Sequence, residues 1–117
     1  MLEPILVGVG GAVGALLRYG VGRWIDSGRL PVTTFVVNVA GSFLLGLLTF
    51  VGVGDTAGLL VGVGLCGSFT TYSSFSVETV RLWETGDPLR AVLYAGATLA
   101  SCAAAVALAW AVTAVVA

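Results

Sequence analysis

Hydroxyl-bearing side chains crowd one short part of an otherwise apolar sequence, the segment Gly67–Phe75. Six of its nine residues carry a hydroxyl, in the order Gly-Ser-Phe-Thr-Thr-Tyr-Ser-Ser-Phe. Hydrocarbon penalises unsatisfied polar groups, so such a patch at membrane depth is usually buried in protein or lines a path. The segment therefore predicts a site that binds or conducts polar or ionic species. The remaining chain must then form the scaffold around it.

Two further polar stripes accompany this segment. Thr34, Asn38 and Ser42 are spaced four residues apart, so they share one face of a helix. We interpret Asn38 as functional because its amide has two donors and a carbonyl that need partners; hydrogen bonding between helices is the alternative. The second stripe, on a later helix, consists of Tyr94, Thr98, Ser101 and Cys102.

The composition is that of an integral membrane protein. Hydrophobic residues make up 58% of the 117 residues and charged residues 9%, with a mean hydropathy of +1.07. The sequence contains no His, which excludes a Ser-His or Cys-His pair and removes the commonest ligand of transition metals. We therefore expect no enzyme. The net charge of −1 offers no basic surface for nucleic acid. Cys66 and Cys102 are expected to be packing residues.

Four apolar stretches have about the length that a membrane-spanning helix needs. They cover residues 4–22, 33–53, 57–77 and 89–116, and their short connections leave no room for a soluble domain. The sequence thus predicts one all-α domain of four transmembrane helices over residues 1–117. The residues before the first stretch lack the basic start of a signal peptide, so we expect this stretch to remain as a helix.

The third span is predicted to be broken near its middle, at Gly67–Thr71. Its hydroxyl and β-branched residues offer the backbone alternative hydrogen bonds, and broken helices expose carbonyls and helix ends that bind ions. Tyr72 and Phe75 then share one face of the helix that resumes, and Glu78 follows near its membrane end. In the first span, Gly10 and Gly14 have the spacing that lets two helix backbones approach closely.

The basic residues predict an orientation. All five lie in or beside the first and third connections, which share one side of the membrane: Arg18, Arg23, Arg29, Arg81 and Arg90. The positive-inside rule places that side in the cytoplasm of a multi-pass plasma-membrane protein, with both termini outside. For Arg18, an interfacial anchor and a functional role are equally compatible with its position near the end of the first span.

Three motifs together resemble the small fluoride channels of the CrcB/Fluc type, over essentially the whole chain. The first is Gly10-Gly11-x-x-Gly14-Ala15-x-x-Arg18-Tyr19 and the second Thr34-Phe35-x-x-Asn38-x-x-Gly41-Ser42-Phe43-x-x-Gly46. The third is Gly64-x-x-Gly67 followed by Ser-Phe-Thr-Thr-Tyr-Ser-Ser-Phe. The resemblance implies a fluoride-selective channel that exports fluoride passively and confers fluoride resistance. It also implies an antiparallel, dual-topology dimer with two pores and a structural Na⁺ at its centre, held by the backbone carbonyls of Gly67 and Thr70.

The same resemblance implies roles for individual side chains. The pore would be lined by Asn38, Tyr72, Phe75, Ser73, Ser74, Tyr94, Thr98, Cys102 and, as a substitute position, Ser101. The vestibule and anchor positions would be Arg18, Glu78 and Thr34. Two departures from the family pattern stand out: Tyr72 occupies a position that is usually Phe, and Thr98 and Cys102 replace frequent Ser.

Elementary chemistry agrees with a fluoride path. Fluoride is small and strongly hydrated, so a pore must replace its water by dense, weakly acidic donors such as amide and hydroxyl groups and aromatic ring edges. A small dual-topology multidrug exporter is an alternative, but it depends on a carboxylate deep in the first helix, and here Glu3 precedes that span. A structural membrane assembly subunit is the other alternative.

The partner subunit stays open between two possibilities. A dual-topology homodimer needs a chain with little orientation bias, whereas this chain places five arginines on one side. The bias therefore favours a fixed orientation, and with it a heterodimer with a homologous subunit of opposite bias.

Overall fold

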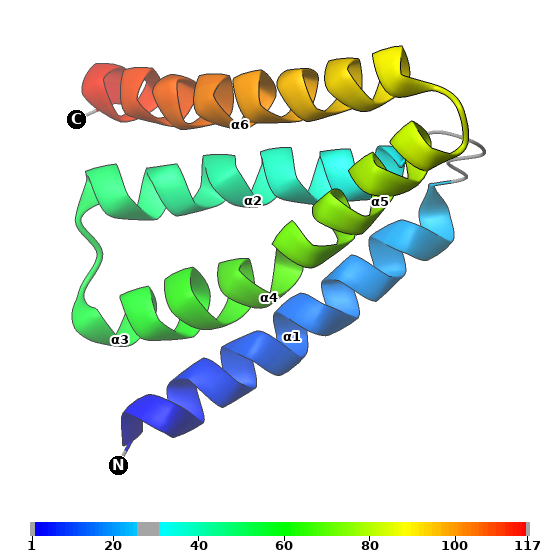
Figure 1. Cartoon of the computed structure of the whole chain (residues 1–117). Helices are drawn as coiled ribbons and strands as arrows, with labels where there is room; N and C mark the ends of the chain where they lie inside the picture. Colours follow the sequence, from blue (N-terminus) through cyan, green and yellow to red (C-terminus); the bar gives the residue numbers. More distant parts are fainter. Residues whose placement is uncertain (1, 26–30, 117) are drawn as a thin grey trace.

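The computed structural model describes residues 2–25 and 31–116, and all regular structure in these ranges is helical, without a strand (Figure 1). Three long helices are α1 (Leu2–Trp24), α2 (Val32–Val51) and α6 (Pro88–Val116). The third span is composite. It consists of α3 (Asp55–Ala57), the π-helix η1 (Gly58–Cys66), α4 (Gly67–Phe69) and α5 (Tyr72–Glu84). The predicted all-α class is confirmed.

Helices α1, α2 and α6 are each long and apolar enough to cross a membrane. Their ends lie within about two residues of the predicted spans. The third span contains no single helix of that length, because Thr70 and Thr71 interrupt it. The span was predicted to end at about residue 77, and α5 continues beyond that point to Glu84, so residues expected in a connection are helical. Their polar side chains lower the local hydropathy without breaking the helix, which is why hydropathy alone ended the span too early.

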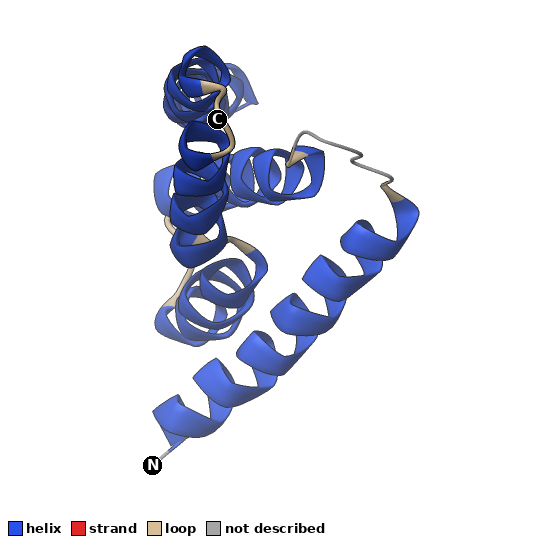
Figure 2. Ribbon diagram, turned by 45° about the vertical axis from the view of Figure 1, so that its right-hand side comes forward, coloured by secondary structure: helices blue, strands red, loops and turns tan. Residues whose placement is uncertain are grey.

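The third span changes packing partners where it is interrupted. Its first half, η1 and α4, contacts mainly α1, whereas its second half, α5, contacts mainly α6. Helix α2 lies along α6 and touches both halves. Figure 2 shows α1 standing apart from the α2 and α6 side of the bundle. The interruption therefore lies between two helix pairs, α1 with η1 and α2 with α6.

The contact between α1 and η1 is made by backbones rather than by side chains. A Cβ added at Gly10 would collide with the carbonyl of Leu60, and one added at Gly14 would collide with that of Leu65. The approach is reciprocal, because a Cβ on Gly64 would lie 2.8 Å from the Val7 carbonyl oxygen. The small residues thus let the two helices meet as their spacing predicted.

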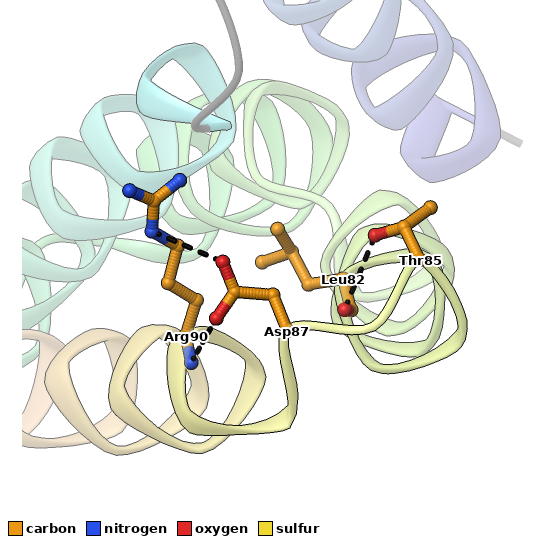
Figure 3. Close-up of polar contacts among 4 residues, drawn as sticks. All are labelled: Leu82, Thr85, Asp87 and Arg90. Carbon is orange, nitrogen blue, oxygen red and sulfur yellow. Dashed lines mark hydrogen bonds and ion pairs between the residues drawn. The ribbon is translucent and has the colours of Figure 1, made fainter.

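The α5–α6 connection lies at the end of the bundle opposite both termini (Figure 1). Asp87 precedes Pro88 and caps α6: its Oδ1 accepts a long hydrogen bond from the Arg90 N–H at 3.4 Å, and its Oδ2 lies 3.3 Å from Arg90 Nε (Figure 3). The Thr85 hydroxyl donates to the Leu82 carbonyl at 3.2 Å. Arg23 and Arg81 belong to helix ends on this side, and Arg29 lies outside the described residues.

Candidate functional site

The interruption of the third span is two residues long. Thr70 (φ −82°, ψ 163°) and Thr71 (φ −150°, ψ 122°) are extended, whereas Gly67 is helical (φ −61°, ψ −32°). The predicted break over residues 67–71 is therefore confirmed in place but was too long. The β-branched threonines leave the helix, and the glycine stays in it.

Both threonines form hydrogen bonds at the two helix ends on either side of the break. Thr70 donates its N–H at 3.0 Å and its hydroxyl at 2.8 Å to the Cys66 carbonyl, which closes the first half. The Thr71 hydroxyl oxygen accepts the N–H of Ser74 at 3.1 Å and so caps α5. It also lies 3.3 Å from the Ser73 hydroxyl. Thr71 had no predicted role of its own, although a hydroxyl residue just before a helix is the usual signal for a cap.

Asn38 reaches from α2 to the extended residue. Its Nδ2 donates to the Thr71 carbonyl at 3.0 Å, and its Oδ1 accepts the Thr71 N–H at 2.7 Å. A side-chain amide thus supplies the two hydrogen bonds that a neighbouring strand would give an extended residue. Gly41, one turn later, allows this approach, since a Cβ there would collide with the Thr70 methyl group. Asn38 therefore makes the interhelical contact considered from sequence, and one N–H remains for another partner.

A groove of about 830 Å³ runs beside the break. Seven of the predicted site residues line it: Asn38, Gly67, Thr70, Tyr72, Phe75, Thr98 and Cys102. Leu45, Val63 and Leu99 contribute to its apolar wall. Tyr72 is 81% exposed on this open side. The groove thus joins α2, both halves of the third span and α6 around one polar centre.

Aromatic rings connect the groove to α6. The ring centroids of Tyr72 and Phe75 lie 6.1 Å apart, and those of Phe75 and Tyr94 lie 5.5 Å apart. Both separations are within the range of favourable edge contacts between rings. The predicted aromatic pair on α5 is therefore extended by a third ring on the polar stripe of α6.

A second polar cluster lies where α2, α5 and α6 meet. The buried Thr34 hydroxyl donates to Glu78 Oε1 at 2.6 Å, a short bond between α2 and α5. Thr34, Thr98 and Glu78 are close enough to interact with the Tyr94 side chain. The hydroxyls of Tyr94 and Thr98 are buried, and neither has a hydrogen-bond partner of good geometry in the described parts of the chain. Neither hydroxyl therefore makes a well-formed hydrogen bond to its neighbours.

The remaining predicted residues are less closely joined to the groove. Ser73 and Ser74 begin α5 beside Thr71, and Ser101 is half-buried on α6 outside the groove lining. Arg18 is half-buried on α1, with no hydrogen bond or ion pair to another described residue. In residues 2–25 and 31–116, no three His, Cys, Asp or Glu side chains gather as a metal site. The oxygen atoms that line the break are backbone carbonyl, hydroxyl and amide oxygens.

Comparison with known proteins gives one consistent result. Residues 5–110 match the family described as CrcB-like protein, Camphor Resistance (CrcB). The chain is 55% identical over 111 residues to fluoride-specific ion channel FluC 2 of Haloarcula marismortui, covering 95% of this chain and 93% of the relative. It is 48% identical to FluC 2 of Rhodococcus jostii, covering 93% and 94%, and 44% identical to FluC of Thermus thermophilus, covering 81% and 80%. The chain belongs to the CrcB family.

Proposed function

We propose that this chain is a subunit of a fluoride-selective channel that lets fluoride leave the cell passively across the plasma membrane and so confers fluoride resistance. The relatives named above are fluoride-specific ion channels. The observation that carries the proposal is the pair of buried hydroxyls on Tyr94 and Thr98, neither of which makes a well-formed hydrogen bond to a described protein group. Within a membrane, an unpaired hydroxyl is costly, and a small anion would accept from both.

The side chains around these hydroxyls suit fluoride. Amide, hydroxyl and ring-edge donors can replace its water without holding it as a full positive charge would, so that it can enter and also leave. Asn38 offers its remaining N–H from the groove, and Phe75 offers its ring edge beside Tyr94. In this proposal the anion passes along α5 and α6, with the Thr34 and Glu78 pair near one end.

The open groove supports assembly with a second subunit in an antiparallel dimer. Tyr72 and Gly67 are exposed on it, although both lie at membrane depth in the third span. Backbone oxygens and a tyrosine hydroxyl facing lipid would be costly, so a partner is required to cover them. The partner is a second copy or, as the five arginines favour, a homologous subunit of opposite bias.

The break also suits a structural Na⁺ at the dimer centre. Gly67 and Thr70 line the groove, and none of the described N–H groups donates to either carbonyl across the break. Carbonyl oxygens are hard ligands of the kind that such cations take. A cation there would satisfy acceptors that the chain leaves open.

Fluoride efflux from liposomes tests the proposed function. Purified protein, alone or with an opposite-bias homologue, should release trapped fluoride to an external fluoride electrode when a potassium ionophore balances the charge. Phe75→Ile should reduce that flux because it removes the ring between Tyr72 and Tyr94. Liposomes that retain fluoride with every candidate partner would refute the channel proposal, and full activity of Phe75→Ile would remove the ring from the path.

Orientation has a separate test. We propose that both termini face outward, since the end of α1, the end of α5 and the start of α6, which carry basic residues, lie at the opposite end of the bundle. A single cysteine added at either terminus, in a chain without Cys66 and Cys102, should react with an impermeant thiol reagent added outside intact cells. Equal labelling from both faces would contradict the fixed orientation and favour a dual-topology homodimer.

A further inference from the structure

The two carbonyls at the break are free for a definable reason. In a continuous α-helix, the N–H of each residue bonds to the carbonyl four residues earlier. The Thr71 N–H would then belong to Gly67, and the Ser74 N–H would belong to Thr70. Here the first donates to Asn38 Oδ1 at 2.7 Å, and the second donates to Thr71 Oγ1 at 3.1 Å. The side-chain oxygens of Asn38 and Thr71 thus accept the two N–H groups that a continuous helix would direct to the Gly67 and Thr70 carbonyls.

The carbonyl just before these residues is bonded differently. The preceding carbonyl, that of Cys66, keeps its helical donor and gains a second one from the Thr70 hydroxyl. The carbonyls of Gly67 and Thr70 lose theirs, and no other described N–H replaces them across the break. Both residues line the open groove. The Cys66 carbonyl is thus fully bonded, whereas the carbonyls of Gly67 and Thr70, like those of Ser68 and Phe69 between them, receive no described backbone N–H across the break.

Asn38 is suited to this task by having both a donor and an acceptor. Its Oδ1 removes the N–H of Thr71, while its Nδ2 satisfies the Thr71 carbonyl at 3.0 Å. The two opposed bonds keep the residue extended and prevent the helix from closing over the break. A shorter or purely apolar side chain would return the Thr71 N–H to its helical acceptor, Gly67.

We propose that Asn38 is a positioning residue for the central cation, and that its carboxamide holds the Gly67 carbonyl free while the Thr71 hydroxyl holds the Thr70 carbonyl free. This inference rests on the proposed Na⁺ site. It gives Asn38 a second role besides its place in the anion path. The two hydrogen bonds to Thr71 support the cation site, and the remaining N–H of the same amide faces the groove.

The dependence of stability on Na⁺ distinguishes a role in cation binding from a role only in helix packing. The thermal unfolding midpoint of the full-length protein, with its partner where one is needed, is measured against Na⁺ with N-methyl-glucamine holding ionic strength constant. Asn38→Leu, which keeps similar volume, should raise the half-saturating Na⁺ concentration about tenfold, the equivalent of one lost polar interaction. Thr71→Val should do the same, and Thr71→Ser should restore the wild-type value.

Thr49→Ala on α2 is the matched control. It also removes a side-chain-to-backbone hydrogen bond, from Thr49 to Leu45 at 2.8 Å, but outside the break. It should change the midpoint at all Na⁺ concentrations without changing the half-saturating one. Should Asn38→Leu not fold, Asn38→Ala and the Thr71 pair carry the same comparison.

The outcomes are distinct from those of the flux assay. Wild-type half-saturation in both Asn38→Leu and Thr71→Val, or a wild-type midpoint that ignores Na⁺, would overturn the positioning role. Absence of fluoride flux in protein whose stability still depends on Na⁺ and on Asn38 would remove the channel proposal and leave the positioning role standing.

Discussion

The two halves of the third span hold their places by different means. The first half, η1 and α4, meets α1 through glycines, with carbonyl groups close to the opposite backbone. The second half, α5, meets α2 and α6 through side chains: the Thr34–Glu78 hydrogen bond and the Phe75–Tyr94 ring contact. Close backbone packing positions the first half, and polar and aromatic side chains position the second.

This difference shows how a small membrane protein can separate support from transport. Glycine contacts let two helix backbones approach closely without side chains between them, so the contact with α1 is suited to hold the scaffold. Polar side chains between α2, α5 and α6 contribute to stability while leaving hydroxyls for another partner. The break lies where the third span changes from one kind of contact to the other.

Overfilling the glycine contact should have the largest effect on stability. Gly14→Val would drive a branched side chain into the Leu65 carbonyl, and overpacking of this kind costs about 3 kcal/mol. Gly8→Ala, on the same helix but with nothing within 4 Å of its Cβ, should remain within about 1 kcal/mol of the wild type. Denaturant titration in mixed micelles measures both; equal stability of the two variants would contradict contact through backbones.

Breaking the polar contact of the second half should have an intermediate effect. Thr34→Val leaves the Glu78 carboxyl without its donor at 2.6 Å and should cost about 2 kcal/mol. A double-mutant cycle with Glu78→Gln should show a coupling of about 1 kcal/mol or more. Thr79→Val, whose hydroxyl bonds only to its own helix at Phe75, serves as the control. Strict additivity of the two changes would argue against the bond.

Removing an unpartnered hydroxyl should have the smallest effect on stability and a large effect on flux. Thr98→Val deletes a buried donor that makes no well-formed hydrogen bond to a described group, so the unfolding free energy should stay within about 1 kcal/mol or rise. Fluoride efflux should fall about tenfold, the equivalent of one anion hydrogen bond. Thr113→Val, an exposed position whose hydroxyl bonds to Trp110, should leave both unchanged. Unaltered efflux in Thr98→Val would place the path elsewhere.

Much of the architecture followed from local signals in the sequence. Hydropathy located α1, α2 and α6 because each is continuous and apolar, and the spacing of Gly10 and Gly14 identified a close helix contact. The hydroxyl cluster located the interruption of the third span. These features depend on neighbours in the chain, so the sequence is sufficient to predict them.

The details of the break depend on residues far away in the chain. Asn38 lies 33 residues from Thr71, and its amide takes the N–H that would otherwise continue the helix. No local preference identifies that bond, and a helix break is easily assigned to Gly67, the most permissive residue nearby. The sequence did not predict that α5 extends to Glu84, because its polar residues resemble a connection. Packing against α6, which hydropathy does not reveal, supports this part of the helix.

The change of partner at Thr70–Thr71 has a mechanical consequence. Because the third span packs on α1 before the break and on α6 after it, a rotation of one helix pair against the other would bend the third span at these two residues. Extended residues are natural pivots, and this pivot is held by the two hydrogen bonds of Asn38. The break is thus a joint in the third span that is held in place by a side chain from α2, the helix that contacts both halves of the span.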